Sequence, residues 1–274
     1  MKVLILGSNG MIGNAIYRKL ITNKEFDIIN LDRRAKEDKL KLDLKNPKKI
    51  KNFINYNEPE VVINCVGIIK QKTAKKSDVY ATNSFFPNQL NYLSTKFNFK
   101  LIQISTDCVF SGSKGFYTEN DAPDATDDYG ISKSLGEIYN NNNLTIRTSC
   151  IGHENHKHGL LEWFLNQEHE CMGYKNAIYS GITSDHFSEI IEKILIYHLH
   201  LNGIVHISSE PISKYDLLLL IARIYNKNIK IISYDKIKID RSLDSTKFKN
   251  LTKFRLKNWY QMISEMKEKK NVEK

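Results

Sequence analysis

Tyr129 and Lys133 are four residues apart, and their types and spacing could support the reduction of a carbonyl group. Side chains four apart on a helix lie on one face. An ammonium group near a phenol lowers the pKa of the phenol from about 10 toward neutrality, as a proton donor to a carbonyl requires. Many such pairs only line a helix surface. We expect this pair to be catalytic because Thr106 precedes it at the end of a predicted strand, where its hydroxyl could donate to the same carbonyl.

A glycine-rich turn near the N-terminus could hold the cofactor for such a reduction. Gly7, Gly10 and Gly13 lie between an apolar run and a helical pattern, and Asp32 follows roughly 20 residues later. Glycines permit a tight turn and close backbone approach, and the free N–H groups of a helix N-terminus bind a pyrophosphate. This context predicts a dinucleotide site, and not a turn that uses glycine for its conformation alone.

The residues after the second predicted strand leave the choice of cofactor open. Asp32 could accept hydrogen bonds from both ribose hydroxyls of NAD, whereas Arg33 and Arg34 could hold the 2′-phosphate of NADP. Both arginines could equally be solvated surface residues. Asp43 and Leu44 could lie along the adenine or belong to the loop before the next helix. We therefore expect either NADPH or NADH.

Strand and helix patterns alternate along the chain and predict how these motifs are positioned. Near-continuous apolar strands that alternate with helices predict a parallel sheet covered on both faces, which is a doubly wound α/β fold of the Rossmann type. The predicted strands are 3–6, 26–31, 61–66, 101–104, 144–146 and 203–207. The predicted helices are 11–20, about 47–56, 80–97, a segment beyond 129, 185–200 and 213–225. Residues 267–274 are polar enough that we expect them to fray.

The order of these elements predicts two parts. We expect residues 1–152, with 185–207 returning to them, to form an NAD(P)-binding Rossmann domain. We expect residues 153–184 and 208–274 to form a smaller substrate-binding lobe over the carboxyl ends of the strands, where such sheets bind ligands.

Composition narrows the class of protein. The 274 residues, 41% of them hydrophobic, suit one large domain or a domain with a small lobe. No run approaches about 18 apolar residues and the first apolar run is too short for a signal peptide, so we expect a cytoplasmic protein without membrane contact. Four cysteines without CxxC spacing favour reduced thiols over a disulfide framework or a zinc site.

The net charge of +10 raises the question of a nucleic-acid partner. The lysines are spread over the chain, and no helix concentrates Lys and Arg with aromatic residues on one face. We therefore expect no nucleic acid among the partners, and a charge that helps to attract an anionic substrate such as a nucleotide.

Several segments together resemble the extended short-chain dehydrogenase/reductases, and among them the dTDP-4-dehydrorhamnose reductase group. The resemblance runs from residue 1 to about 152 and resumes at 241–248. Its segments are the glycine turn 7–13, Asn-Cys-Val-Gly at 64–67, Ser-Thr-Asp-Cys-Val-Phe-Ser-Gly at 105–112, Tyr-Gly-Ile-Ser-Lys-Ser-Leu-Gly-Glu at 129–137 and Ile-Arg-Thr-Ser at 146–149.

The resemblance implies that a nicotinamide delivers hydride to C4 of a 4-keto-6-deoxy nucleotide sugar, in surface polysaccharide synthesis and without a metal. It implies a catalytic triad of Thr106, Tyr129 and Lys133, in which Tyr129 is the acid and Lys133 also holds the nicotinamide ribose. A homodimer is left open. The other positions that match cofactor-lining residues are Gly7, Asn9, Gly10, Met11, Ile12, Gly13, Asp32, Asp43, Cys65, Val66, Gly67 and Asn83.

Substrate contacts are expected where the chain leaves the sheet after residue 146 and in the late motif. The nucleotide sugar must lie in the cleft between the lobes so that its C4 faces the nicotinamide. An arginine can bind a diphosphate bidentately, although Arg241 could instead pair with a neighbouring aspartate. The candidate substrate-binding residues are Arg147, Thr148, His153, Trp163, Arg241 and Asp244.

Departures from the group leave alternatives open. Cys108 occupies the position of a glutamate in sugar-nucleotide dehydratases, which disfavours a dehydratase. Epimerase/reductases that resemble GDP-fucose synthase carry a cysteine at this position and pair it with a histidine, for which His153, His156 and His158 are available. Cys108 could also be a small buried hydrophobe.

A regulatory subunit that keeps the fold without the chemistry is a further alternative, because some relatives of this kind bind methionine adenosyltransferase. Such a chain could lose the tyrosine or the lysine of the triad. Both Tyr129 and Lys133 are present, which favours an enzyme.

Overall fold

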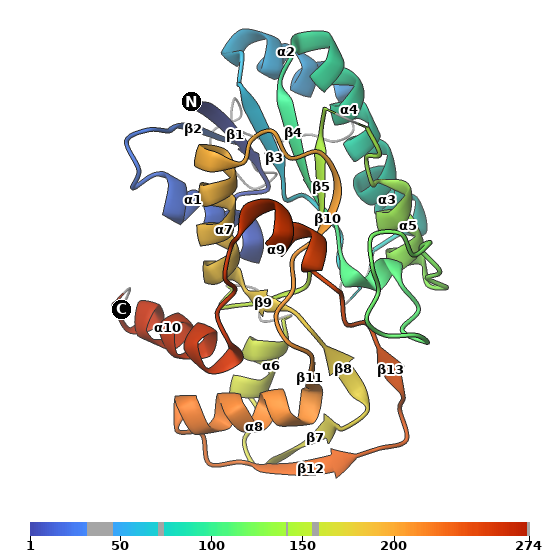
Figure 1. Ribbon diagram of the computed structural model, residues 1–274, viewed down its shortest axis with the longest axis vertical. Helices are drawn as coiled ribbons and strands as arrows, with labels where there is room; N and C mark the ends of the chain where they lie inside the picture. The colour runs from blue at the N-terminus through green and yellow to red at the C-terminus, as the bar shows by residue number, and fades with distance from the viewer. Residues whose placement is uncertain (32–45, 71–73, 141, 155–158, 273–274) are drawn as a thin grey trace.

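A six-stranded parallel sheet forms the centre of the protein (Figure 1). The computed structural model describes residues 1–31, 46–70, 74–140, 142–154 and 159–272. The strand order is β10-β5-β4-β3-β1-β2, and every neighbouring pair is parallel. The doubly wound α/β fold predicted from the sequence is thereby confirmed. The strands are β1 (Lys2–Leu6), β2 (Asp27–Leu31), β3 (Val61–Asn64), β4 (Lys100–Ile104), β5 (Leu144–Arg147) and β10 (Gly203–His206).

Helices cover both faces of the sheet because successive residues of each strand point to opposite faces. In β1, Val3 and Ile5 join one apolar cluster and Leu4 and Leu6 join another. The first face packs against α1 (Met11–Leu20) and α7 (Ser184–Tyr197). The second packs against α2 (Pro47–Asn57) and α4 (Phe86–Phe97), and α5 (Asp128–Leu135) lies next to α4 in Figure 1.

The carboxyl ends of β1 and β3 form the point at which the strand order reverses. From β1 the chain passes to β2 on one side, and then returns to β3 on the other side. Open parallel sheets bind ligands in the crevice outside such a switch point. The glycine turn follows β1, and residues 65–67 follow β3, so both predicted cofactor segments lie there.

The remaining elements lie below the large sheet in Figure 1, at its carboxyl end, except α9, which lies beside β10. They include two parallel pairs, β6 with β9 and β7 with β12, and the three-stranded sheet β11-β8-β13. Lys247 of α9 donates from Nζ to the Ile204 carbonyl of β10 at 2.7 Å. The elements are β6 (Cys150–Ile151), α6 (Leu160–Leu165), β7 (Glu170–Tyr174), β8 (Ala177–Tyr179), β9 (Ile182–Thr183), β11 (Ile212–Ser213), α8 (Lys214–Tyr225), β12 (Lys230–Tyr234), β13 (Ile239–Asp240), α9 (Thr246–Thr252) and α10 (Trp259–Val272).

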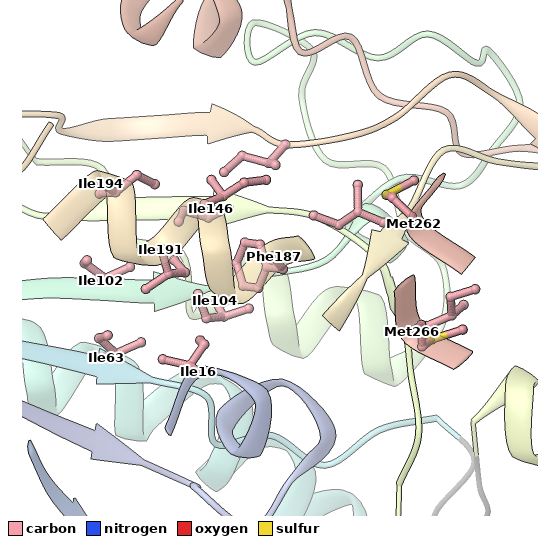
Figure 2. Close-up of a cluster of buried hydrophobic side chains, with 14 of the residues drawn as sticks. Ile16, Ile63, Ile102, Ile104, Ile146, Phe187, Ile191, Ile194, Met262 and Met266 are labelled. Atoms are coloured by element: carbon pink, nitrogen blue, oxygen red, sulfur yellow. The ribbon is translucent and has the colours of Figure 1, made fainter. Parts of the chain in front are cut away.

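The C-terminal segment is helical, and the expectation that residues 267–274 fray is wrong for those up to 272. Trp259, Met262, Ile263 and Met266 recur at helical spacing and are buried in the same cluster as the first face of the sheet. Figure 2 shows Met262 and Met266 at the end of the cluster that lies beyond Phe187 of α7. This apolar stripe stabilises α10 although its outer surface is polar.

The helix predicted over 80–97 begins earlier and is interrupted. It consists of α3 (Lys76–Tyr80), a π-helical turn η2 (Ala81–Phe85) and α4. Pro87 has no N–H with which to bond the Asn83 carbonyl four residues back, so the regular α-helical ladder cannot continue there. Instead, the Asn83 carbonyl lies so close to Gly136 that a Cβ there would be 1.9 Å away.

Within the described residues, no helix is long and apolar enough to cross a membrane.

Candidate active site

The glycine turn has the geometry of a dinucleotide-binding loop. Gly7 adopts a positive φ of 83°, and its N–H donates to the Leu31 carbonyl at 2.8 Å. A Cβ on Gly13 would lie 2.3 Å from the Gly7 carbonyl oxygen, so only glycine allows α1 to begin this close to β1. Gly10 caps α1 without a side-chain hydrogen bond. The first turn of α1 thus offers N–H groups to a phosphate, and the residues present fit a dinucleotide.

The segment after β3 forms the adjacent wall of this site. A Cβ on Gly7 would lie 3.2 Å from the backbone of Cys65 and Val66, so the two loops are in van der Waals contact. Asn83 is fully buried, and its amide accepts from the Ile68 N–H at 2.9 Å and donates to the Ile68 carbonyl at 3.0 Å. The Asn83 side chain therefore holds the loop that follows Gly67, whereas the sequence predicted that it lines the cofactor.

Thr106 and Tyr129 are brought together by the packing of α5 against the segment after β4. Thr106 caps the 3₁₀ turn η3 (Asp107–Val109), where its hydroxyl accepts from the Cys108 N–H at 3.2 Å. A Cβ on Gly130 would lie 2.2 Å from the Cys108 carbonyl oxygen. This close approach places Tyr129, in the first turn of α5, beside Thr106, which is near enough to act on the phenol.

Burial raises the pKa of Tyr129, and the nearby Cys108 adds to the effect, while Thr106 opposes it. The expectation that Lys133 lowers this pKa is wrong for this structure, because the ammonium is held elsewhere. Lys133 donates from Nζ to the Ile104 carbonyl at 2.7 Å. Tyr129 consequently remains protonated at neutral pH, which is the form that an acid needs.

Lys133 is itself buried, and this burial lowers its pKa to about 8, with opposing contributions from Glu137 and Cys65. Cys65 contacts the glycine turn, and Lys133 is near enough to Cys65 for the two to interact electrostatically. Lys133 therefore lies on the side of Tyr129 where the cofactor is expected to bind.

The prediction that Arg147 binds the substrate is wrong. Its side chain is 1% exposed and points to the face of β5 opposite Ile146. The guanidinium donates to Glu137 at 2.8 Å from Nε and at 2.7 Å from one terminal nitrogen, and it lies 5.0 Å from the centre of the Phe110 ring. These contacts leave Arg147 without access to a diphosphate.

The positions of His153 and Trp163 do not support the substrate-binding roles expected of them, because neither residue lies beside a catalytic group. The two ring nitrogens of His153 lie 2.6 Å from Glu162 of α6 and 2.9 Å from the Tyr225 hydroxyl of α8, so this histidine joins two helices. Trp163 is an exposed residue of α6. His156 and His158 lie outside the described residues, as do Asp32, Arg33, Arg34, Asp43 and Leu44.

Arg241 lies next to the catalytic segment. It donates from Nε to the Phe110 carbonyl at 2.8 Å, and a terminal nitrogen lies 3.9 Å from the Cys108 sulfur. Its backbone is held in place because Asp240 donates from its N–H to the Gly112 carbonyl at 2.7 Å. The alternative of a surface ion pair with a neighbouring aspartate is not what the structure shows.

Two functional neighbours, Glu137 and Asp107, were missed as candidates. Glu137 is buried and accepts from the Ser105 hydroxyl at 2.6 Å, while Asp107 accepts from the Thr106 hydroxyl at 3.1 Å. Both stand inside the motifs that carry the family resemblance, and their charge in otherwise buried segments was the available signal. In the described part of the chain, no three His, Cys, Asp or Glu side chains are grouped to hold a metal ion.

Comparisons with solved structures agree with this architecture. A dTDP-4-dehydrorhamnose reductase from Bacillus anthracis, in complex with NADP, matches 98% of this chain and 99% of its own with a TM-score of 0.86 at 20% identity. A dTDP-4-dehydrorhamnose reductase from Clostridium acetobutylicum matches 99% of this chain and 100% of its own, with a TM-score of 0.86 at 23% identity. At these identities the likeness concerns the fold.

Sequence comparisons identify relatives and the family of the chain. A dTDP-4-dehydrorhamnose reductase from Aggregatibacter actinomycetemcomitans is 26% identical over 234 residues, which are 80% of this chain and 78% of that protein. Methionine adenosyltransferase 2 subunit beta from Danio rerio is 30% identical over 137 residues, 50% of this chain and 42% of that protein. A model of the RmlD substrate binding domain family matches residues 1–271, and the chain belongs to this family.

Proposed function

We propose that the protein is an NADPH- or NADH-dependent oxidoreductase that reduces the 4-keto group of a 4-keto-6-deoxy nucleotide sugar, as dTDP-4-dehydrorhamnose reductases do. The observation that carries this proposal is the meeting of Tyr129 and Thr106 at the carboxyl end of β4, with Lys133 buried between them and the glycine turn. The names of the Aggregatibacter relative and of the NADP-bound Bacillus structure support the substrate class and the cofactor. The role would lie in surface polysaccharide synthesis in the cytoplasm.

The residues of the site divide the reaction between them. When bound, the reduced nicotinamide supplies the hydride. Tyr129 donates its phenolic proton to the oxygen of the carbonyl as it is reduced, and burial favours the protonated phenol that this step requires. Thr106 donates a hydrogen bond to the same oxygen, and the Lys133 ammonium offers its remaining protons to the ribose of the cofactor.

We assign residues 1–152 and 185–207 to the cofactor and residues 153–184 and 208–274 to the nucleotide sugar. Arg241 supports this assignment, because it reaches the Cys108–Phe110 segment from the C-terminal part of the chain. Its remaining N–H groups are the ones that we propose for the diphosphate.

The epimerase/reductase alternative is less well supported. It needs a thiol and a histidine on either side of a carbon next to the ketone. Burial raises the pKa of the Cys108 thiol to about 12, and both nitrogens of His153 are occupied by Glu162 and Tyr225. In D₂O an epimerase would exchange deuterium into the sugar at C3 or C5 and would lose this exchange in Cys108→Ser. We expect no uptake.

The second alternative is a regulatory subunit, for which the similarity to methionine adenosyltransferase 2 subunit beta gives a reason. Turnover separates the two. We expect the purified protein to oxidise NADPH or NADH with at least one member of a panel of 4-keto nucleotide sugars, and NMR of the product will show which ketone is reduced. A chain that binds the cofactor but turns over no member of the panel would favour the regulatory role.

We also propose that the protein is a homodimer, formed through an exposed apolar surface on η2, α4 and α5. Phe85, Tyr92 and Leu135 are exposed there, and Asn88 donates to the Leu135 carbonyl at 2.9 Å, which ties the helices together. Exposed large apolar side chains on neighbouring helices favour association. Sedimentation should give a dimer, and Tyr92→Glu should give a monomer; a monomeric wild-type protein would contradict this proposal.

A further inference from the structure

Glu137 is a buried carboxylate for which the mechanism above has no use. It lies just beyond α5, four residues after Lys133, and its side chain is fully shielded from solvent. A buried carboxylate is costly unless it is paired and hydrogen-bonded. Each oxygen of Glu137 has two partners. One accepts from Ser105 at 2.6 Å and from Arg147 at 2.8 Å, and the other accepts from Arg147 at 2.7 Å and from Tyr139 at 2.9 Å.

The hydrogen bond to Ser105 connects Glu137 with the catalytic segment. Ser105 follows β4 directly and precedes Thr106, so its side chain fixes the direction in which the chain leaves the sheet. The Ser105 N–H donates to the Ile146 carbonyl of β5 at 2.8 Å. Backbone and side chain of Ser105 are therefore held from β5 and from the end of α5 at once, which leaves Thr106 little freedom.

Glu137 also acts electrostatically on Lys133. Within the described part of the chain, the Lys133 ammonium donates to one protein group, the Ile104 carbonyl, and it lies in the field of the Glu137 carboxylate. Burial alone would favour the neutral amine, and an anion nearby favours the ammonium. Without the carboxylate, the lysine would lose the larger of the two electrostatic contributions that keep it charged.

We propose that Glu137 is a positioning residue of the active site, whose carboxylate anchors the segment that carries Thr106 and keeps the Lys133 ammonium charged in its buried place. Arg147 is the counter-ion that offsets the energetic cost of burying this carboxylate. The proposal rests on the catalytic roles proposed above for Thr106 and Lys133.

The groups that face these two residues are few. Lys133 faces Glu137 and, from the segment after β3, the Cys65 thiol. Glu137 faces Arg147 of β5, with Tyr139 beside it. Beyond Arg147 lies His206 of β10, 3.3 Å from the guanidinium, and burial together with Arg147 lowers the pKa of this histidine to about 4, so it is neutral at physiological pH.

A titration of Lys133 tests the proposal without any turnover. In protein labelled at the lysine ε-carbon, Lys133 should titrate near pH 8, unlike exposed lysines, and Lys133→Arg identifies its signal. In Glu137→Gln the titration should move to lower pH by about one unit, the scale of one lost neighbouring charge. Glu189→Gln is the matched control. It removes a carboxylate on α7 that pairs with Lys257 and with Lys269 of α10, and it should leave the titration of Lys133 unchanged.

Glu137→Gln leaves Arg147 buried without its partner and could unfold the protein. The double variant Glu137→Gln with Arg147→Met replaces the pair by uncharged side chains of similar volume, which folds in many proteins. It should also show a downward shift, but a smaller one, because the positive charge of Arg147 is removed together with the carboxylate. A folded single or double variant in which Lys133 titrates as in the wild-type protein would overturn the proposal.

The pH dependence of kcat/KM tests whether the charge of Lys133 matters for catalysis. If the charged lysine is required, kcat/KM of the wild-type enzyme falls as pH rises through the pKa of Lys133, and in the variants this fall begins at lower pH. If Glu137 had a purely structural role, its replacement would lower kcat/KM without changing the pH at which kcat/KM falls. If no nucleotide sugar is turned over by the wild-type protein, the proposed function fails, while the titration still decides whether Glu137 controls the charge of Lys133.

Discussion

The first turn of α1 begins directly against the Gly7 carbonyl, because Gly13 has no side chain. A Cβ on Gly13 would lie 2.3 Å from that oxygen, closer than real contacts allow, and the neighbouring atoms are backbone. Gly10 stands at the start of the same helix, yet a Cβ there would lie 3.4 Å from the Gly7 oxygen, an ordinary contact. The two glycines therefore differ sharply in what they tolerate.

We predict that Gly13→Ala weakens NADPH binding by about tenfold or more and destabilises the fold by about 1–3 kcal/mol, since the backbone around the loop must shift. Gly10→Ala should cost little stability, because its Cβ would make only an ordinary contact within the protein. Cofactor titration followed by protein fluorescence measures NADPH binding, and thermal unfolding measures stability. Equal destabilisation by the two variants would contradict the role given to the close approach.

Tyr129→Phe removes the phenolic proton and leaves the ring in place. We predict a loss of about 10²-fold or more in kcat, because no other acid reaches the carbonyl in the proposed geometry. The affinity for NADPH should change little. The disappearance of the reduced nicotinamide follows the reaction, and full turnover in this variant would remove Tyr129 from the role of acid.

Local rules were enough to predict most of what the site needs. The glycine turn, the catalytic tyrosine and lysine and the strands that precede them are set by neighbours within a few residues, by apolar runs and by helical spacing. The same holds for the parallel sheet, since alternating buried strands and amphipathic helices have few other ways to pack.

Contacts between distant segments could not be read from the sequence. Arg147 looked like a ligand for phosphate because it ends a strand, but a strand residue faces one side or the other, and here Arg147 faces a buried glutamate. His153 is held by Tyr225, 72 residues away. The interruption at η2 depends on Pro87, whose effect was visible in principle from its missing N–H.

Arg241 gives a prediction about the substrate. Because the guanidinium is partly buried beside Cys108 and bonded to the Phe110 carbonyl, it is already oriented toward the catalytic segment. We predict that Arg241→Gln raises KM for the nucleotide sugar about tenfold or more and leaves the affinity for NADPH unchanged. Asp240→Asn, at the preceding residue, serves as control for the local charge. An unaltered KM in Arg241→Gln would assign this arginine to packing alone.

His206 makes the stability of the protein depend on pH. Its ring is buried, and burial together with Arg147 lowers its pKa from 6.5 to about 4. Its Nδ1 donates to the Tyr117 carbonyl at 3.0 Å, and the other nitrogen faces the guanidinium of Arg147 at 3.3 Å, so only the neutral ring fits. The unfolded chain takes up a proton below pH 6.5 that the folded protein does not bind.

Stability is therefore predicted to fall as pH drops from about 6.5 toward 4, by about 3 kcal/mol over the whole range. Carboxylates whose pKa is lowered in the folded protein, such as Glu189, lose their contribution only as pH approaches the ordinary carboxylate range, so they do not explain a loss of stability above pH 5. His198, whose pKa is also lowered by burial, adds to the loss in that interval. In His206→Gln, which keeps a donor and an acceptor but cannot be protonated, urea unfolding should show lower stability at pH 7 and a flatter dependence between pH 6.5 and 5. A dependence as steep as that of the wild-type protein would mean that another group takes up the proton.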